Sequence, residues 1–158
     1  MSKHPNVSNA ADLEWMARGN DDKFSCECKR LAMAAGGVKL GCNLFRVQPG
    51  KRAFPKHRHF ANEEAVYILK GHATMYRGDE AIAVGPGDYI VHHAGGVAHQ
   101  MINSGDEPLE YLCFSTMNQP EVVEYPDSKK LGMITGMPPE GIVKFFPADA
   151  NVNYWEGE

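Results

Sequence analysis

Short apolar runs separated by turn residues fill the middle of the chain. Eight of them are candidate strands. They cover residues 39–48, 52–59, 63–71, 72–78, 80–85, 88–93, 97–103 and 109–116. The 16 glycines and 10 prolines punctuate the whole chain and do not gather in a linker. This pattern predicts an all-β sandwich or barrel.

The run over residues 63–71 is apolar on both faces, unlike a strand with one solvated face. Alternation places Glu64, Val66 and Ile68 on the inner face. Tyr67 and Leu69 then point outward and need a cover. The C-terminal segment or a second copy of the chain would supply it, and we expect a homodimer.

The two ends of the chain differ from the middle. Residues 10–18, followed by Gly19, predict a short helix with Asn9 as its cap, and residues 31–35 predict another helical turn. Residues 119–158 are proline-rich but retain many apolar and aromatic side chains. We therefore predict an N-terminal extension (1–37), a β-barrel (38–118) and an irregular C-terminal arm (119–158) that packs on the barrel or on a partner subunit.

Length and charge exclude several classes of partner. A chain of 158 residues fits one domain with a core of its own. The formal net charge is −4 and no basic stripe is present, which argues against nucleic acid. No apolar run is long enough to cross a bilayer, and residues 1–15 lack the apolar stretch of a secretory signal. We therefore expect no membrane partner and a cytoplasmic location.

The chain has four cysteines, at positions 26, 28, 42 and 113. Cys26 and Cys28 form a C-x-C pair that could be half of a metal site. No second close pair completes a tetrahedral set. We expect free thiols, with Cys42 and Cys113 packed as small apolar groups on strands.

Histidines and a glutamate gather around one apolar strand. Side chains two residues apart on a strand share a face, so His57 and His59 present two imidazoles to one side. Glu64 would be the first inward residue of the next strand, and His99 begins another short strand. Three neutral imidazoles and one carboxylate suit Mn, Fe, Co, Ni, Cu or Zn rather than Ca. The sequence therefore predicts a divalent transition metal ion as cofactor.

Two spaced motifs make the chain resemble the cupins. The first cupin motif is Gly, five residues, His-x-His, three or four residues, Glu, six residues, Gly. Here it reads Gly50, six residues, His57-Arg58-His59, four residues, Glu64, six residues and Gly71. The spacing to Gly71 selects Glu64 rather than Glu63 as the matching acid.

The second motif begins at Gly87. It continues with five residues, His93-Ala94-Gly95, three residues, His99, three residues and Asn103. It departs from the cupin pattern at His93, where a proline is usual, and by one extra residue before His99. The resemblance covers roughly residues 38–118 and implies a double-stranded β-helix, the jelly-roll barrel. Residues 119–158 resemble the tail of small bacterial single-domain cupins of largely unassigned activity.

His93 is the candidate catalytic residue. One of His92 and His93 must face inward, and an imidazole at the cavity mouth could carry a proton near neutral pH. A histidine that caps a turn is the alternative. Glu63 should point to the opposite face, solvated or paired with Arg or Lys.

Four further residues are candidates for substrate binding. Arg46 and Gln48 lie on the strand that leads into the first motif and could hold an anionic or hydroxylated substrate, although such residues are often merely exposed. Met101 shares strand parity with His99 and should line the cavity, and Phe114 is a further apolar lining candidate.

Four protein ligands on an octahedral ion leave two positions for water or substrate oxygens. Three functions are open: isomerisation or epimerisation of a small sugar, sugar phosphate or hydroxy-keto acid; iron-dependent dioxygenation of a chelating substrate; and non-catalytic binding of a small ligand or metal. Resemblance to small cupins described as sugar-phosphate-isomerase-like favours the first.

Overall fold

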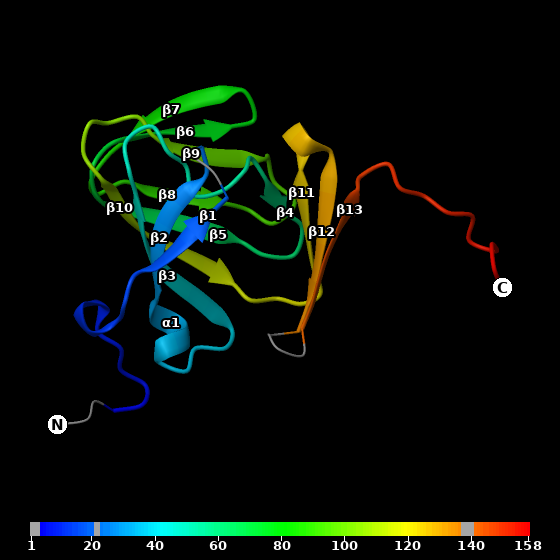
Figure 1. The fold of residues 1–158 in the computed structure, drawn as a ribbon, viewed down its shortest axis with the longest axis horizontal. Helices are drawn as coiled ribbons and strands as arrows, with labels where there is room; N and C mark the ends of the chain where they lie inside the picture. The colour runs from blue at the N-terminus through cyan, green and yellow to red at the C-terminus, as the bar shows by residue number, and fades with distance from the viewer. Residues whose placement is uncertain (1–3, 21–22, 137–140) are drawn as a thin grey trace.

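Three antiparallel sheets make up most of the computed structural model, which describes residues 4–20, 23–136 and 141–158 (Figure 1). The six-stranded sheet contains, in order, β1 (Met16–Gly19), β2 (Ser25–Arg30), β3 (Leu40–Val47), β10 (Leu109–Thr116), β5 (Glu64–Lys70) and β8 (Tyr89–His92). The three-stranded sheet contains β7 (Glu80–Val84), β6 (Ala73–Arg77) and β9 (His99–Asn103). The four-stranded sheet contains β13 (Ile142–Pro147), β12 (Lys130–Thr135), β11 (Glu121–Tyr125) and β4 (Arg58–His59).

Helix is confined to short pieces in the described ranges. They are the 3₁₀ turns η1 (Ala10–Asp12) and η2 (Pro126–Ser128) and the single α-helical turn α1 (Leu31–Ala34). None of these helices could cross a lipid bilayer. The all-β prediction is confirmed.

The core lies on the inner face of the six-stranded sheet, where β5 and β10 follow the predicted alternation. Val66 and Ile68 are 5% and 1% exposed, whereas Tyr67 and Leu69 are 38% and 45% exposed. The inward side chains of β10, which include Tyr111, join the same buried cluster. Glu64, at the start of β5, is therefore directed into the barrel with the core.

The helix predicted over residues 10–18 forms only as one 3₁₀ turn, Ala10–Asp12, and the rest of that prediction is wrong. Asn9 does cap that turn, since its side chain accepts a hydrogen bond from the backbone N–H of Ala11 at 2.9 Å. The chain then extends into β1, which pairs with β2. Trp15 lies under two cations, with Arg46 at 4.0 Å and Lys29 at 4.6 Å from its ring centroid. These tertiary contacts override the local helical pattern.

The predicted strand over residues 52–59 is mostly irregular, and the C-terminal segment is more regular than expected. Only Arg58 and His59 of 52–59 form a strand, β4, which pairs with β11. Strands β11, β12 and β13 occupy much of the segment that was expected to be irregular. Pro120 and Pro126 flank β11 and Pro147 ends β13, so these prolines mark strand ends, where no ladder N–H is needed.

Gly71 forms a tight turn between β5 and β6. Its φ is +80°, and a Cβ there would lie 2.8 Å from the Pro108 carbonyl oxygen and 2.9 Å from the Leu109 Cα. We expect Gly71→Ala to lower the free energy of unfolding by about 2–4 kcal/mol, from left-handed strain plus steric overlap with backbone. Gly87→Ala is the control, because Gly87 also has a positive φ (+93°) but open space around it. Urea denaturation of both variants measures the difference, and equal losses would contradict the overlap argument.

Candidate metal centre

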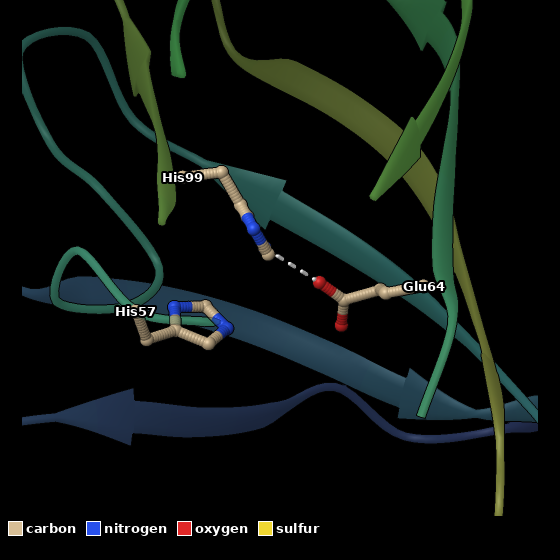
Figure 2. Close-up of side chains that lie close together, drawn as sticks. All are labelled: His57, Glu64 and His99. Carbon is tan, nitrogen blue, oxygen red and sulfur yellow. Dashed lines mark hydrogen bonds and ion pairs between the residues drawn. The ribbon is translucent and has the colours of Figure 1, made fainter. Parts of the chain in front are cut away.

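Three side chains from separate segments converge between the sheets. One ligand atom each from His57, Glu64 and His99 lies within 4.8 Å of the other two (Figure 2). His57 and His99 are bridge partners, and their backbones exchange N–H···O bonds of 3.0 and 2.8 Å. Glu64 approaches from the first position of β5. The structure thus brings together three of the four residues that the sequence predicted as metal ligands.

His57 is held in one tautomer by its own loop. The ring is buried, and its Nδ1–H donates to the Pro55 carbonyl oxygen at 2.8 Å. This bond leaves Nε2 as the nitrogen available to an ion. Burial, together with the positive charge that His99 can carry, lowers the pKa of His57 to about 4. The imidazole is therefore neutral at pH 7, the form that binds metal.

Glu64 accepts hydrogen bonds at both carboxylate oxygens. His99 donates through Nε2–H to Oε2 at 3.0 Å, and the Cys113 thiol donates to Oε1 at 3.2 Å. Burial alone would raise the pKa of Glu64, but the His99 hydrogen bond and the neighbouring imidazoles lower it to about 2. Burial and the Glu64 charge raise the pKa of the Cys113 thiol well above its usual value. The site therefore holds a carboxylate beside a neutral thiol.

His59, the fourth predicted ligand, lies beside the cluster, but it is not among the residues whose ligand atoms all lie within 4.8 Å of one another. Its ring centroid is 5.0 Å from that of His57 and 6.3 Å from that of His99. Its Nδ1 is 3.5 Å from Oε2 of Glu121, which is longer than a good hydrogen bond. Both ring nitrogens are buried without a hydrogen-bond partner in the described part of the chain.

His92, which the sequence left undecided, is the inward histidine of its pair. It is 5% exposed and stacks on His99 with ring centroids 3.6 Å apart and planes at 5°. Burial and the charge that His99 can carry lower the pKa of His92 to about 3. His92 is the register partner of Glu64 on β8. The alternation of β5, extended across the sheet to β8, was the signal that could have identified it.

His93 lies on the other side of the strand end. Its side chain is 71% exposed, and its Nδ1–H donates to Oε2 of Glu63 at 2.9 Å. The structure therefore does not place the predicted catalytic histidine at the cavity. Glu63 faces away from the cluster, as the alternation rule predicts, and is paired with His93 rather than with Arg or Lys.

The cavity at the cluster has a volume of about 30 Å³, enough for an ion with a water molecule. Met101 lines it as predicted, and Phe54, Gln100 and Tyr111 add to its wall. Gln100 is held in place, since its Nε2 donates to the Phe54 carbonyl oxygen at 2.8 Å. Phe54 and Gln100 occupy unspecified positions within the two motifs, and Tyr111 lies outside both.

Three of the predicted substrate-binding residues lie away from this cavity. Phe114 sits on the opposite face of β10 from the cavity-lining Cys113. Arg46 donates through Nε to Glu110 at 2.8 Å and stacks over Trp15, and Gln48 is exposed in the turn after β3. Strand alternation explains these positions, because Phe45 and Val47 take the inward places on β3.

The residues present fit a divalent transition metal. Imidazole nitrogen and carboxylate oxygen form a borderline donor set. Five buried imidazole nitrogens have no hydrogen-bond partner in the described ranges: both of His59, both of His92 and Nδ1 of His99. Buried polar atoms without partners are rare and point to an ion or a ligand that would satisfy them. His57, Glu64 and His99 can hold such an ion, and its identity is open.

Comparison with known proteins identifies the fold. Residues 43–115 match the family model of the cupin domain. A candidate sugar phosphate isomerase from Acidithiobacillus ferrooxidans superposes with a TM-score of 0.82 at 25% identity, covering 94% of this chain and 97% of that one. A sugar phosphate isomerase of the cupin superfamily from Silicibacter pomeroyi gives 0.79 at 21% identity, covering 92% and 96%. A candidate oxalate decarboxylase from Thermotoga maritima gives 0.62 at 21% identity, covering 71% and 99%.

One curated relative shares higher identity over a shorter stretch. An uncharacterized protein of Methanocaldococcus jannaschii is 37% identical over 59 residues, which is 37% of this chain. The match spans 46% of that protein, less than half of its length. Together these findings support a small protein with a cupin domain over residues 43–115 and a jelly-roll fold, as the two sequence motifs predicted.

Proposed function

We propose that the protein is a metal-dependent isomerase or epimerase of a small sugar, sugar phosphate or hydroxy-keto acid. The observation that carries the proposal is the convergence of His57, Glu64 and His99 at a small cavity, where both ring nitrogens of His92 and Nδ1 of His99 are buried without a partner in the described ranges. Two solved structures that cover 94% and 92% of this chain are named as sugar phosphate isomerases, one of them as a candidate.

When bound, a divalent ion would supply a Lewis acid that polarises a carbonyl or hydroxyl oxygen of the substrate. Isomerisation also needs a group that accepts a proton from carbon. His92 is better placed than His93 for this role, because it is buried in the cavity wall with both ring nitrogens unpartnered in the described ranges. Its pKa, lowered to about 3 mainly by burial, leaves the ring unprotonated at pH 7.

The test combines metal analysis with a substrate panel. Protein purified without chelators is analysed for bound metals and incubated in D₂O with aldoses, ketoses, their phosphates and hydroxy-keto acids. Manganese or zinc with interconversion and deuterium incorporation at the carbon next to the carbonyl would support the proposal. Metal binding with no turnover across the panel would reject the catalytic part and leave a binding protein.

Iron-dependent dioxygenation is the second candidate, and the apolar part of the cavity wall favours it. Phe54, Val66, Met75 and Met101 line the space beside the cluster. An apolar lining suits a site that binds O₂ and a chelating organic substrate. Bound iron together with substrate-dependent O₂ consumption would replace the isomerase proposal with this one.

We also propose a homodimer. Tyr67 and Leu69 remain half-exposed, and Tyr89 on the neighbouring strand β8 is 63% exposed, so β11–β13 do not cover this face. A second copy would bury it. Light scattering at micromolar concentration should give twice the chain mass of 17.4 kDa, and Tyr67→Lys with Leu69→Lys should shift the protein to monomer. A monomeric parent protein would contradict the prediction.

A cytoplasmic location is part of the same proposal. All four cysteines are free thiols, and Cys26, Cys28 and Cys113 are buried. Unpaired cysteines are typical of reducing compartments. Cell fractionation would test the location directly.

A further inference from the structure

Strand β11, in the C-terminal segment of the chain, lies against the segment that carries His57 and His59. β11 pairs with β4, with Val123 opposite His59, and Figure 1 shows the two strands side by side. The Tyr125 ring at the end of β11 stacks 6.1 Å from the ring of His57. This strand begins at residue 121, beyond the segment that matches the cupin domain. Part of the support for the ligands therefore comes from outside the matched domain.

Glu121, the first residue of β11, is a buried acid with an unusual number of donors around it. It is 4% exposed, and its Oε1 accepts backbone N–H bonds from Phe60 at 3.1 Å and Ala61 at 3.2 Å. Its Oε2 accepts from Nδ2 of Asn62. These bonds fix the loop that connects His59 to Glu64.

The same Oε2 atom lies 3.5 Å from Nδ1 of His59. If the His59 ring moved slightly closer to the Glu121 carboxylate, this contact would become an Nδ1–H···O hydrogen bond. The other ring nitrogen, Nε2, would then be free for an ion. His57 has the equivalent arrangement, with Pro55 as the acceptor for its Nδ1–H. In metal centres, a ligating histidine almost always donates its second N–H to a carboxylate or carbonyl oxygen.

We propose that Glu121 is the positioning residue that turns His59 into the fourth ligand of the metal centre, through a carboxylate–histidine–metal arrangement. The proposal rests on the proposed metal binding and adds to it a residue that neither sequence motif contains. Glu121 would act in two ways: it holds the 60–62 loop through three donors, and it fixes the tautomer and direction of the His59 ring.

The first test uses the unaltered protein, loaded with Zn²⁺ and labelled with ¹⁵N-histidine. The expected spectrum shows His59 with a proton on Nδ1 and the metal on Nε2. Zinc bound through Nδ1 of His59, or a His59 that does not respond to zinc while His57 and His99 do, overturns the proposal. Failure of all three histidines to respond rejects the metal site itself, so the two failures are distinguishable.

The second test compares Glu121→Gln with Glu124→Gln, a change on the same strand. Glu124 pairs with Arg58, whose side chain is not part of the cluster. With Cu²⁺ as a spin probe, pulsed EPR should count three coupled imidazoles in the parent protein and Glu124→Gln but two in Glu121→Gln. The dissociation constant for Zn²⁺ should rise about 10- to 100-fold in Glu121→Gln alone.

Repeating the Glu121→Gln change in the His59→Ala variant distinguishes positioning of the His59 ring from general support of the 60–62 loop. If Glu121 acts through His59, adding Glu121→Gln to His59→Ala weakens Zn²⁺ binding by less than 3-fold further. A loss in this background as large as in the parent protein, or an unchanged count of three imidazoles in Glu121→Gln, overturns the proposal.

Discussion

Glu64→Ala is expected to abolish stoichiometric binding of a divalent transition metal, and His99→Ala is expected to do the same. Glu64 is the only carboxylate in the His57–Glu64–His99 cluster of the described chain, and its low pKa keeps it charged at any pH of interest. Removing it takes away the negative ligand and leaves the Cys113 thiol and the His99 N–H without their acceptor. The dissociation constant should rise at least about 100-fold, since both a ligand and the orientation of its neighbours are lost.

Glu63→Ala is the matched control for this experiment. Glu63 precedes Glu64 in the chain but points outward, where it pairs with His93. Its removal should leave metal content unchanged, as measured by inductively coupled plasma mass spectrometry after dialysis against a metal mixture. Equal metal content in Glu63→Ala and Glu64→Ala would place any bound metal elsewhere in the protein.

The parts of this site that sequence could predict are those fixed by local strand geometry. Glu64, Val66 and Ile68 alternate inward as expected, because the side-chain period of a strand is two residues and apolar burial sets which face is inside. His57 and Glu64 could be predicted from the motif spacing, because that spacing is the number of residues the chain needs to turn from one strand to the next. Met101 follows from its parity with His99 on β9.

The parts that sequence could not predict depend on contacts between distant segments. The choice between His92 and His93 is set where β8 pairs with β5, which places His92 opposite Glu64. The helix predicted over residues 10–18 does not form beyond its first turn, because β1 pairs with β2 and the Arg46 and Lys29 side chains pack on the Trp15 ring. Arg46 is drawn into that contact, so it is a structural residue of the outer sheet surface and does not reach the cavity.

The position of Glu121 could not be predicted from the sequence either. Its sequence neighbourhood, with Pro120 before it and Val122 and Val123 after it, is that of an ordinary edge strand. Only the pairing of β11 with β4 carries its carboxylate to the His59 loop. A buried acid with donors from a ligand-bearing loop can be recognised from a structure, but no local pattern in residues 119–125 distinguishes it from a surface glutamate.

Acid should destabilise the metal-free protein well above the pH at which its carboxylates are protonated. The pKa of His57 falls from 6.5 to about 4 on folding and that of His92 from 6.5 to about 3, mainly because of burial. Between pH 6.5 and 4 the unfolded chain therefore binds protons that the folded chain excludes, and stability falls as the pH falls. His57 alone contributes about 3 kcal/mol over this interval. Glu64, with its pKa lowered to about 2, adds a further loss that begins near pH 4.5 and continues below it.

Urea denaturation in EDTA at pH 7, 6, 5 and 4.5 measures this loss, and His92→Phe identifies one of its sources. A phenyl ring preserves the stacking on His99 but cannot be protonated, so the variant should lose less stability between pH 7 and 4.5 than the parent protein does. His93→Gln is the control, because His93 is exposed beside Glu63 and outside the cavity. If stability falls equally with pH in the parent protein and in His92→Phe, then His92 is not the buried neutral imidazole that its contacts with the cavity indicate.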